Sequence, residues 1–210
     1  MIRVILVDDH AMIRRGLRET LTEAGGIEVV GEAADYPALR ELLRQQPCDV
    51  LLLDVSLPGR NGIEILGALV QSYPDVKAVM LSQYPEDQYG VRAMKHGAMA
   101  YLNKSAEPSQ IVLAVRTAAG GRRYVTPEIA QALVETVAGR HDGLPHERLS
   151  EREMQTLLRI ARGERLSEIA AALVLSPKTV SVYRARVLEK LGLSTNADIA
   201  AYAIRNRLVD

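Results

Sequence analysis

The chain has 210 residues, 48% of them hydrophobic and 25% charged, which is the composition of a globular protein with one large or two ordinary domains. No apolar run approaches the roughly 18 residues that a membrane span requires, and Met1 leads straight into an apolar stretch without a signal-peptide pattern, so we expect a cytoplasmic protein that has no membrane partner. A single cysteine, Cys48, excludes an intrachain disulfide, and the absence of Phe and Trp argues against single-stranded nucleic acid as a ligand.

The formal net charge of zero conceals an asymmetry along the chain. Residues 1–147 carry 15 Lys and Arg against 19 Asp and Glu, whereas residues 148–210 carry 11 against 7. A basic C-terminal part suits a polyanionic partner, although basic helix faces are commonly only solvated.

The first 120 residues alternate apolar strand patterns with amphipathic helix patterns. Because the strand patterns are near-continuous apolar runs, both faces of the sheet should be covered, which indicates a five-stranded parallel sheet with helices on each side. The predicted strands are Arg3–Val7, Glu28–Gly31, Val50–Leu53, Ala78–Leu81 and Ala100–Leu102. The predicted helices are Met12–Ala24, Tyr36–Gln45, Gly62–Ser72, Gln88–His96 and Ser109–Ala119.

The remaining residues contain only helix and linker patterns. Thr126 and Pro127 begin a predicted short helix to Ala138, and Gly139–His146 is typical of a linker. The residues Ser150-Glu151-Arg152-Glu153 form a capping box that begins a helix to about Ala161, and three further helical segments follow. We therefore predict a domain over 1–120, a linker with a short helix over 121–146, and an all-α domain over 147–210.

Five polar residues lie at the carboxyl ends of the predicted strands. They are Asp8, Asp9, Asp54, Ser82 and Lys104. In an open parallel sheet the ligand crevice lies outside these strand ends, so residues far apart in sequence should meet there. Taken singly, each would more often be a turn residue, a helix cap or a solvated charge, but their shared placement favours a site.

Three close carboxylates repel one another unless a cation neutralises them. Carboxylate oxygens with spare coordination positions suit Mg²⁺. Such an ion and the Lys104 ammonium could offset the charge of a phosphoryl group that is transferred to a carboxylate nucleophile, and Ser82 could donate a hydrogen bond to the attached group. The sequence therefore predicts a magnesium-dependent phosphoryl-transfer site.

Short motifs surround these residues, namely Val7-Asp8-Asp9-His10, Leu53-Asp54-Val55-Ser56-Leu57-Pro58-Gly59, Gly62, Leu81-Ser82, Gly97-Ala98 and Tyr101-Leu102-Asn103-Lys104. Together they resemble the receiver domain of two-component response regulators, a flavodoxin-like doubly wound α/β fold, over about residues 1–120. The resemblance implies that Asp54 is the phosphoacceptor for a sensor histidine kinase. It further implies that Asp8, Asp9, Asp54 and the Ser56 main-chain carbonyl hold Mg²⁺. Ser82 and Tyr101 resemble the switch pair of that family, with core packing of Tyr101 as the competing interpretation.

Near the C-terminus, a short apolar-faced helix over Ser167–Leu173 is followed by a tight connection and a longer helix over Pro177–Leu191. Ser176 is the expected N-cap of the longer helix, and Gly192 closes it. This arrangement is that of a helix-turn-helix, whose second helix enters the major groove of DNA. The same geometry also occurs in domains that bind proteins.

The motifs Leu149-Ser150-Glu151-Arg152-Glu153, Ile169-Ala170, Leu175-Ser176-Pro177-Lys178-Thr179-Val180 and Leu191 resemble the output domain of the NarL/FixJ, or LuxR-type, regulators over about residues 147–210. The resemblance implies phosphate or sugar contacts by Lys178, Thr179, Tyr183, Arg184 and Arg186, and an approach to base edges by Ser181, Val182 and Ala185. It also implies a homodimer on DNA, supported by the last helix over Asn196–Arg205. Ile199 and Ala203 are the predicted dimerisation residues, although the apolar stripe of this helix could instead close the small core.

These features predict a bacterial transcription factor that is controlled by phosphorylation of Asp54 and binds double-stranded promoter DNA, with RNA polymerase as a further candidate partner. Two alternatives remain. An aspartate-nucleophile phosphatase is disfavoured because Ser56 stands where such enzymes have a second Asp, so we do not expect a turnover enzyme. A DNA-binding protein that dimerises without phosphate is disfavoured by the complete acidic cluster.

Overall fold

The computed structural model describes residues 1–210 except 59–61, 85, 138–143, 207 and 210. Contacts between residues divide the chain into two compact units, Met1–Val137 and Ala138–Asp210. Each unit buries its own set of apolar side chains.

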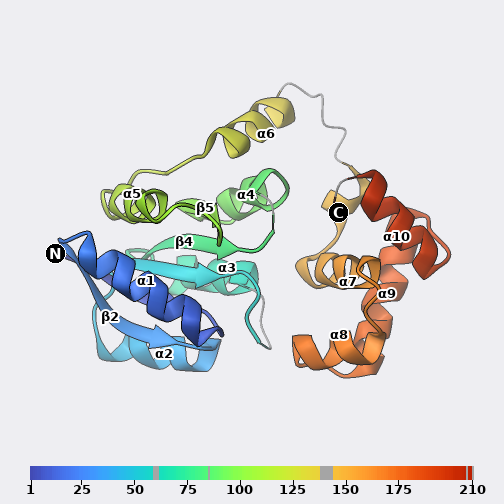
Figure 1. Ribbon diagram of the computed structural model, residues 1–210, viewed down its shortest axis with the longest axis horizontal. Helices are drawn as coiled ribbons and strands as arrows, with labels where there is room; N and C mark the ends of the chain where they lie inside the picture. The colour runs from blue at the N-terminus through green and yellow to red at the C-terminus, as the bar shows by residue number, and fades with distance from the viewer. Residues whose placement is uncertain (59–61, 85, 138–143, 207, 210) are drawn as a thin grey trace. The chain divides into compact units, whose positions relative to one another are not determined.

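The first unit is a five-stranded parallel sheet with strand order β2-β1-β3-β4-β5, flanked by helices (Figure 1). Its elements in chain order are β1 (Ile2–Val7), α1 (Ala11–Glu23), β2 (Ile27–Ala33), α2 (Tyr36–Gln45), β3 (Val50–Asp54), α3 (Gly62–Ser72), β4 (Lys77–Ser82), α4 (Glu86–Lys95), β5 (Ala100–Asn103), α5 (Pro108–Ala119) and α6 (Pro127–Val137). The predicted doubly wound sheet is confirmed, and the predicted strands differ from the observed ones only at their ends.

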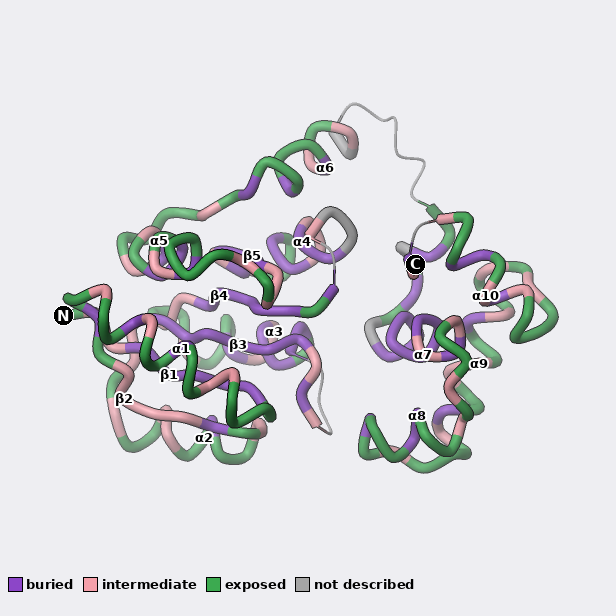
Figure 2. Tube along the Cα trace, viewed as in Figure 1, coloured by how far each residue is buried: buried purple, intermediate pink, exposed green. Residues whose placement is uncertain are grey.

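Side chains that alternate along the strands fill two apolar layers, because successive residues of a strand point to opposite faces. On one face Leu6, Leu52 and Leu81 join α1 and α5 in a single buried cluster. The intervening residues, such as Leu51 and Met80, are also fully buried and point to the opposite face. Figure 2 shows the resulting burial of the central strands. Burial on both faces is why these strands appear in the sequence as continuous apolar runs.

Helix α6 belongs to the first unit. Thr126 is 3% exposed and its carbonyl accepts the Ala130 amide, so it starts this helix as the Thr-Pro pair suggested. Before the helix, the Tyr124 amide donates to the Met99 carbonyl at the edge of β5. The predicted linker 121–146 therefore includes a helix packed on the sheet domain, while its residues 138–143 lie outside the described part of the chain.

The described residues of the second unit form helices and the turns that connect them. Its elements are a short 3₁₀ helix (Pro145–Arg148), α7 (Glu151–Ala161), α8 (Leu166–Leu173), α9 (Pro177–Leu191) and α10 (Asn196–Arg205). The predicted Ser150 capping box is present, since the Ser150 hydroxyl accepts the Glu153 amide and the Glu153 carboxylate accepts the Ser150 amide. The sequence patterns do not predict the 3₁₀ helix Pro145–Arg148, which spans the boundary between the predicted linker (121–146) and the predicted helical domain (147–210).

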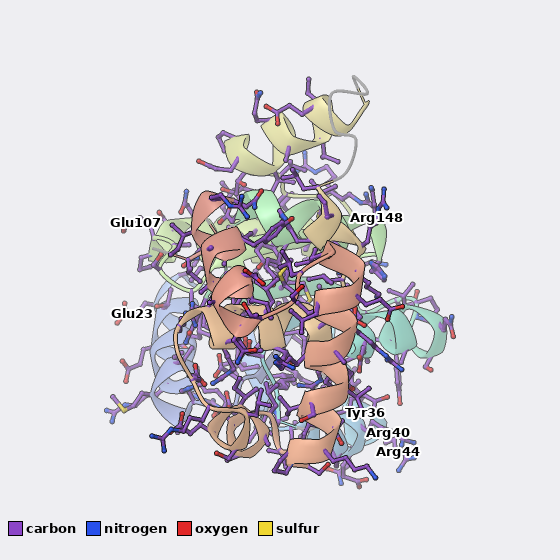
Figure 3. The ribbon with its side chains drawn as sticks, turned by 90° about the vertical axis from the view of Figure 1, so that its right-hand side faces the viewer. Glu23, Tyr36, Arg40, Arg44, Glu107 and Arg148 are labelled. Carbon is purple, nitrogen blue, oxygen red and sulfur yellow. The ribbon has the colours of Figure 1, made fainter. Side chains whose placement is uncertain are left out.

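Helix α2 carries a row of exposed or half-buried polar side chains. On α2, Tyr36, Arg40 and Arg44 follow one another at helical spacing and lie close together in Figure 3. The Arg40 guanidinium carbon lies 6.0 Å from the centre of the Tyr36 ring, a weak cation–π contact on a solvated face. Among the described residues, no helix is long and apolar enough to cross a membrane.

Candidate acidic site and helix-turn-helix face

The predicted acidic residues meet at the carboxyl edge of the sheet. Asp54 ends β3, and Asp8 and Asp9 follow β1, its neighbour in the sheet. Ligand atoms of Asp8, Asp9, His10 and Asp54 all lie within 4.8 Å of one another. Asp54 is 1% exposed and Asp8 2% exposed, so two of the three carboxylates are buried.

Lys104 bridges the two buried carboxylates. Its Nζ lies 2.6 Å from Asp8 Oδ2 and 2.8 Å from Asp54 Oδ2. The Lys104 amide donates to the Ser82 carbonyl at 2.6 Å, which fixes the start of the β5–α5 connection against the end of β4. The lysine is therefore held by its main chain and by its ammonium group, and it cannot turn toward solvent without leaving two buried acids unpaired.

The charges of the cluster favour the binding of a further cation. Burial raises the pKa of Asp54 above its usual range, and repulsion by the Asp8 carboxylate raises it further. The attraction of Lys104 lowers this pKa but does not offset the other two effects. Burial alone would lower the pKa of Lys104, but the two carboxylates outweigh it and raise this pKa. The Lys104 ammonium thus pairs with two of the three acids, and the hard oxygen ligands in this arrangement fit Mg²⁺.

Ser56 is brought to the cluster through its main chain. Its amide donates to Asp54 Oδ1 at 3.0 Å, so one carboxylate oxygen of Asp54 is held by Ser56 and the other by Lys104. Gly62, the first residue of α3, lies against the same strand end. An added Cβ at Gly62 would stand 2.2 Å from the Asp54 carbonyl oxygen, so only glycine allows α3 to begin there.

Two residues near the site were not identified from the sequence. The His10 amide donates to Asp8 Oδ1 at 2.8 Å, and His10 Nδ1 lies 2.7 Å from Asp9 Oδ1. Arg14 Nη1 donates to the Asp8 carbonyl at 2.5 Å, while Arg14 Nε lies 3.1 Å from a carboxylate oxygen of Glu32 on β2. The sequence contains a signal for Arg14. It lies four residues after His10, so on a helix the two side chains share the face that lies next to the end of β1.

The predicted switch residues Ser82 and Tyr101 are fully buried. They meet through the main chain of Tyr84. The Ser82 hydroxyl accepts the Tyr84 amide at 3.0 Å, and the Tyr101 hydroxyl donates to the Tyr84 carbonyl at 3.3 Å. The buried Tyr101 ring packs as a core residue, as the competing interpretation held, but its hydroxyl also reaches the connection that begins at Ser82.

The second unit contains the predicted helix-turn-helix. Ser176 caps α9, since its hydroxyl accepts the Thr179 amide at 3.0 Å, and Pro177 follows at the first helical position. Val180 and Val187 are 0% exposed on the inner face of α9, and α8 supplies Ile169 and Leu173 to the same core. Val174 turns the chain between the helices in the left-handed region, with φ of 55°.

The outer face of α9 carries the predicted DNA-contact residues. Lys178, Ser181, Val182, Ala185 and Arg186 are exposed, whereas Thr179, Tyr183 and Arg184 are half-buried. Arg184 is already occupied, because its Nε donates to Asn196 Oδ1 at the start of α10 at 2.5 Å. The outer face of α9 is therefore mildly basic and exposed to solvent between Lys178 and Arg186.

The predicted dimerisation residues do not lie on the surface. Ile199 and Ala203 are both 0% exposed, because they face α7 and close the core of their own unit. The prediction that these two side chains contact a partner is therefore wrong, and the alternative that the stripe closes the core is correct for them. The exposed side of α10 carries Ala197, Ala201 and Ile204.

Comparison with known families divides the chain in the same way. Residues 4–116 match the family described as "Response regulator receiver domain", and residues 147–203 match "Bacterial regulatory proteins, luxR family". The two matches together span more than half of the chain.

Similar proteins carry both parts. The "Response regulator GacA" of Pseudomonas aeruginosa is 40% identical over 100% of this chain and 99% of its own length. The "Response regulator UvrY" of Escherichia coli K12 is 39% identical over 99% of this chain and 96% of its own. A solved structure of RcsB from Salmonella enterica serovar Typhimurium, bound to promoter rprA with phosphomimetic BeF3-, is 25% identical, has a TM-score of 0.67 and covers 96% of this chain and 97% of its own. The chain therefore belongs to the NarL/FixJ family of two-component response regulators, which join a receiver domain to a LuxR-type DNA-binding domain and regulate transcription.

Proposed function

We propose that Asp54 accepts a phosphoryl group from a sensor histidine kinase and that this modification promotes dimerisation and DNA binding. The observation that carries the proposal is the bridging of Asp8 and Asp54 by Lys104 at the buried carboxyl edge of the sheet. A buried ammonium shared by two acids is positioned to attract a phosphoryl oxygen once Asp54 is phosphorylated, because formation of the acyl phosphate removes the carboxylate charge that Lys104 now pairs with.

In this proposal one carboxylate oxygen of Asp54 attacks the phosphorus of a phosphohistidine. The new O–P bond forms as the P–N bond breaks, and the electron pair returns to the donor imidazole. Ser56 and Lys104 hold Asp54 in a fixed orientation for this attack, so the chain contributes positioning and charge neutralisation, which is what phosphoryl transfer requires.

The residues that would hold Mg²⁺ are Asp8, Asp9 and Asp54, with the Ser56 carbonyl as the fourth protein ligand. When bound, the ion would offset the negative charge on the transferred phosphoryl oxygens. Three carboxylates within 4.8 Å of one another, against one ammonium, fit a divalent cation with oxygen ligands. Arg14 keeps the Asp8 main chain in place through its bond to the carbonyl oxygen.

For the output unit, we propose that α9 lies in the major groove of promoter DNA as the second helix of the helix-turn-helix. Lys178 and Arg186 would contact phosphates, while Ser181, Val182 and Ala185 would approach base edges. The RcsB complex with promoter DNA supports this use of the fold. Homodimerisation would use the exposed side of α10, and contact with RNA polymerase would follow on the promoter.

The decisive experiment is DNA selection from a random pool with and without a phosphodonor and Mg²⁺, in wild type and Asp54→Asn. The wild type should enrich a two-fold-related site only with the phosphodonor, and the variant should enrich none. A phosphate-affinity gel on the same samples reports modification directly. Enrichment of the same site by Asp54→Asn with the phosphodonor would overturn the proposed control, and would favour the DNA-binding protein that dimerises without phosphate.

We further propose that the receiver is not a turnover phosphatase. The position two residues after Asp54 is occupied by Ser56, whose amide is engaged by Asp54, so a carboxylic general acid is absent at that position. Incubation of the full chain with a generic phosphomonoester should release no more than one equivalent of phosphate. Sustained release that is lost in Asp54→Asn would show an enzyme instead.

A further inference from the structure

Helix α6 is packed against α4, as Figure 1 shows. Ile129 of α6 lies against Gly90 of α4. An added Cβ at Gly90 would stand 2.5 and 2.6 Å from two side-chain carbons of Ile129. The isoleucine side chain therefore occupies the position that a larger side chain at Gly90 would need. Both residues are buried. The Ile129 side chain therefore packs directly on the α4 backbone at Gly90, and any larger residue at position 90 would have to displace it.

The carboxylate of Glu86, the first residue of α4, ties α6 to the end of the sheet. One oxygen accepts the amide of Asn103, which ends β5 directly before Lys104, at 2.9 Å. The other oxygen accepts the hydroxyl of Thr126, the residue that starts α6, at 2.5 Å. A single side chain thus connects the strand end of the acidic site with the N-terminus of α6.

The same corner includes the predicted switch residues. Between Ser82 and Glu86, the main chain of Tyr84 donates to the Ser82 hydroxyl and accepts from the Tyr101 hydroxyl and from Asn103 Nδ2. The ring of Tyr84 stacks on that of Tyr89 within α4, with ring centres 4.9 Å apart. A rotation of the Ser82 side chain that moves its hydroxyl away from the Tyr84 amide would therefore remove one of the bonds that hold the segment before α4.

We infer that α6 senses the phosphorylation state of the receiver through Glu86. This inference rests on the proposed function of Asp54. In the unphosphorylated chain, the Glu86–Thr126 bond and the Ile129–Gly90 contact hold α6 against α4. When the Ser82 hydroxyl turns to a phosphoryl oxygen, Tyr84 loses its acceptor, the start of α4 shifts, and α6 loosens. Because α6 is the last helix before the output unit in the chain, its loosening changes the tether of the DNA-binding part.

The test is hydrogen–deuterium exchange of the full-length chain, followed over residues 128–135. With Mg²⁺ and beryllofluoride, a phosphoryl mimic, these amides should exchange about tenfold faster than in the untreated chain. Fluorine NMR on the same sample reports whether the mimic has bound. Failure of binding at Asp54 would reject the proposed function, whereas bound beryllofluoride with unchanged α6 exchange would reject the inference.

Two variants test the contacts without any phosphodonor. Thr126→Val keeps the side-chain volume but removes the hydroxyl, which donates to Glu86 and also accepts the Ile129 amide in the first turn of α6, and should speed exchange in α6 about fivefold. Thr117→Val is the matched control, because the Thr117 hydroxyl donates to the Leu113 carbonyl within its own helix, α5, and its removal should leave α6 exchange unchanged.

Gly90→Ala tests the steric contact. The added methyl should displace Ile129 and speed α6 exchange, and the double variant Gly90→Ala with Ile129→Ala should show a less than additive increase because both changes remove the same contact. Circular dichroism confirms that each variant is folded. Wild-type exchange in both folded Thr126→Val and folded Gly90→Ala would overturn the inference, since neither contact would then hold α6.

Discussion

The two units of the chain carry their charged functional groups in opposite ways. In the receiver, Asp8 and Asp54 are buried and share the ammonium of Lys104, while in the output unit Lys178 and Arg186 stand exposed on α9. A buried site has already removed water from its groups, so each of them is strongly coupled to the others. An exposed helix face keeps its charges hydrated until a polyanion arrives, so its residues act almost independently.

The difference teaches where single substitutions should matter. Removing one member of the receiver cluster leaves an unpaired buried charge, which is among the few changes that destabilise a protein strongly. If the α9 face binds DNA as proposed, removing one of its residues should take away one of several contacts with DNA and leave the fold intact. We therefore expect single substitutions to have their largest effects on stability in the receiver and smaller effects in the output unit.

The largest effect is expected for Lys104→Met. Without the ammonium, two buried carboxylates lack their shared cation, and the free energy of unfolding of the receiver should fall by about 3 kcal/mol in the absence of Mg²⁺. Urea unfolding followed by far-UV circular dichroism measures this loss, and added Mg²⁺ should restore part of it. Lys95→Met, on the exposed side of α4, is the control. Equal losses in the two variants would remove the contrast between the units.

A smaller effect is expected for Glu153→Gln, which tests the one buried acid–lysine pair described in the output unit. Burial would raise the pKa of Glu153, but the hydrogen bonds from Lys190 and Ser150 outweigh it and lower this pKa. The pair therefore stabilises the fold above the unfolded-state pKa of about 4.3, and this contribution is lost as the pH falls through the folded-state value.

Glu153→Gln should accordingly lower the free energy of unfolding by about 1.5 kcal/mol at pH 7, and the difference from wild type should shrink below about pH 4. Thermal unfolding of both proteins over pH 3–8 measures it. Glu189→Gln, an exposed carboxylate on α9, is the matched control. A difference that grows toward low pH would contradict the sign of the pKa shift.

Arg186→Ala should weaken DNA binding about fivefold at moderate salt, because it removes one phosphate contact. The slope of the logarithm of affinity against the logarithm of salt concentration should become shallower by about 1. Fluorescence anisotropy on the selected site measures both quantities. Arg184→Ala is an informative comparison, since Arg184 already bonds Asn196, and its loss should also disturb the α9–α10 junction. An unchanged salt slope for Arg186→Ala would show that its side chain does not meet a phosphate.

The smallest effect is expected for Val182→Ala. The Val182 side chain is 44% exposed and offers only an apolar contact to a base edge. Its truncation should change affinity about twofold and should relax the preference at one base pair. Competition binding with single-base variants of the site resolves such a change. A loss larger than that of Arg186→Ala would mean that the face reads sequence mainly through this residue.

The fold was predictable from the sequence because both faces of its strands are buried. Continuous apolar runs such as Val50–Leu53 indicated a covered parallel sheet, and strand-end placement then brought Asp8, Asp54 and Lys104 together. The contacts of Glu86 were not predictable in this way. They depend on the direction of one side chain at the start of α4 and on the packing of α6, which neither periodicity nor turn signals specify.

Ile199 and Ala203 show a second limit. The apolar period of α10 indicated which side chains are buried, but it does not distinguish burial in the same unit from burial against a partner. The α7 helix covers these two residues, and only the arrangement of the helices in space reveals it. Arg14 illustrates the reverse case, because its position one turn after His10 contained a usable signal that attracted no prediction.

The close approach of Gly62 to the Asp54 carbonyl has an evolutionary consequence. At most surface positions, drift among several amino acids leaves a protein unharmed, but here even a methyl group would collide with the Asp54 carbonyl oxygen. A mutation at position 62 could persist only with a simultaneous retreat of α3, and that retreat would open the layer beneath β3. The glycine that follows Asp54 by eight residues is thus a steric signature of the end of β3, and it should mark that strand in distant sequences whose acidic motifs have diverged.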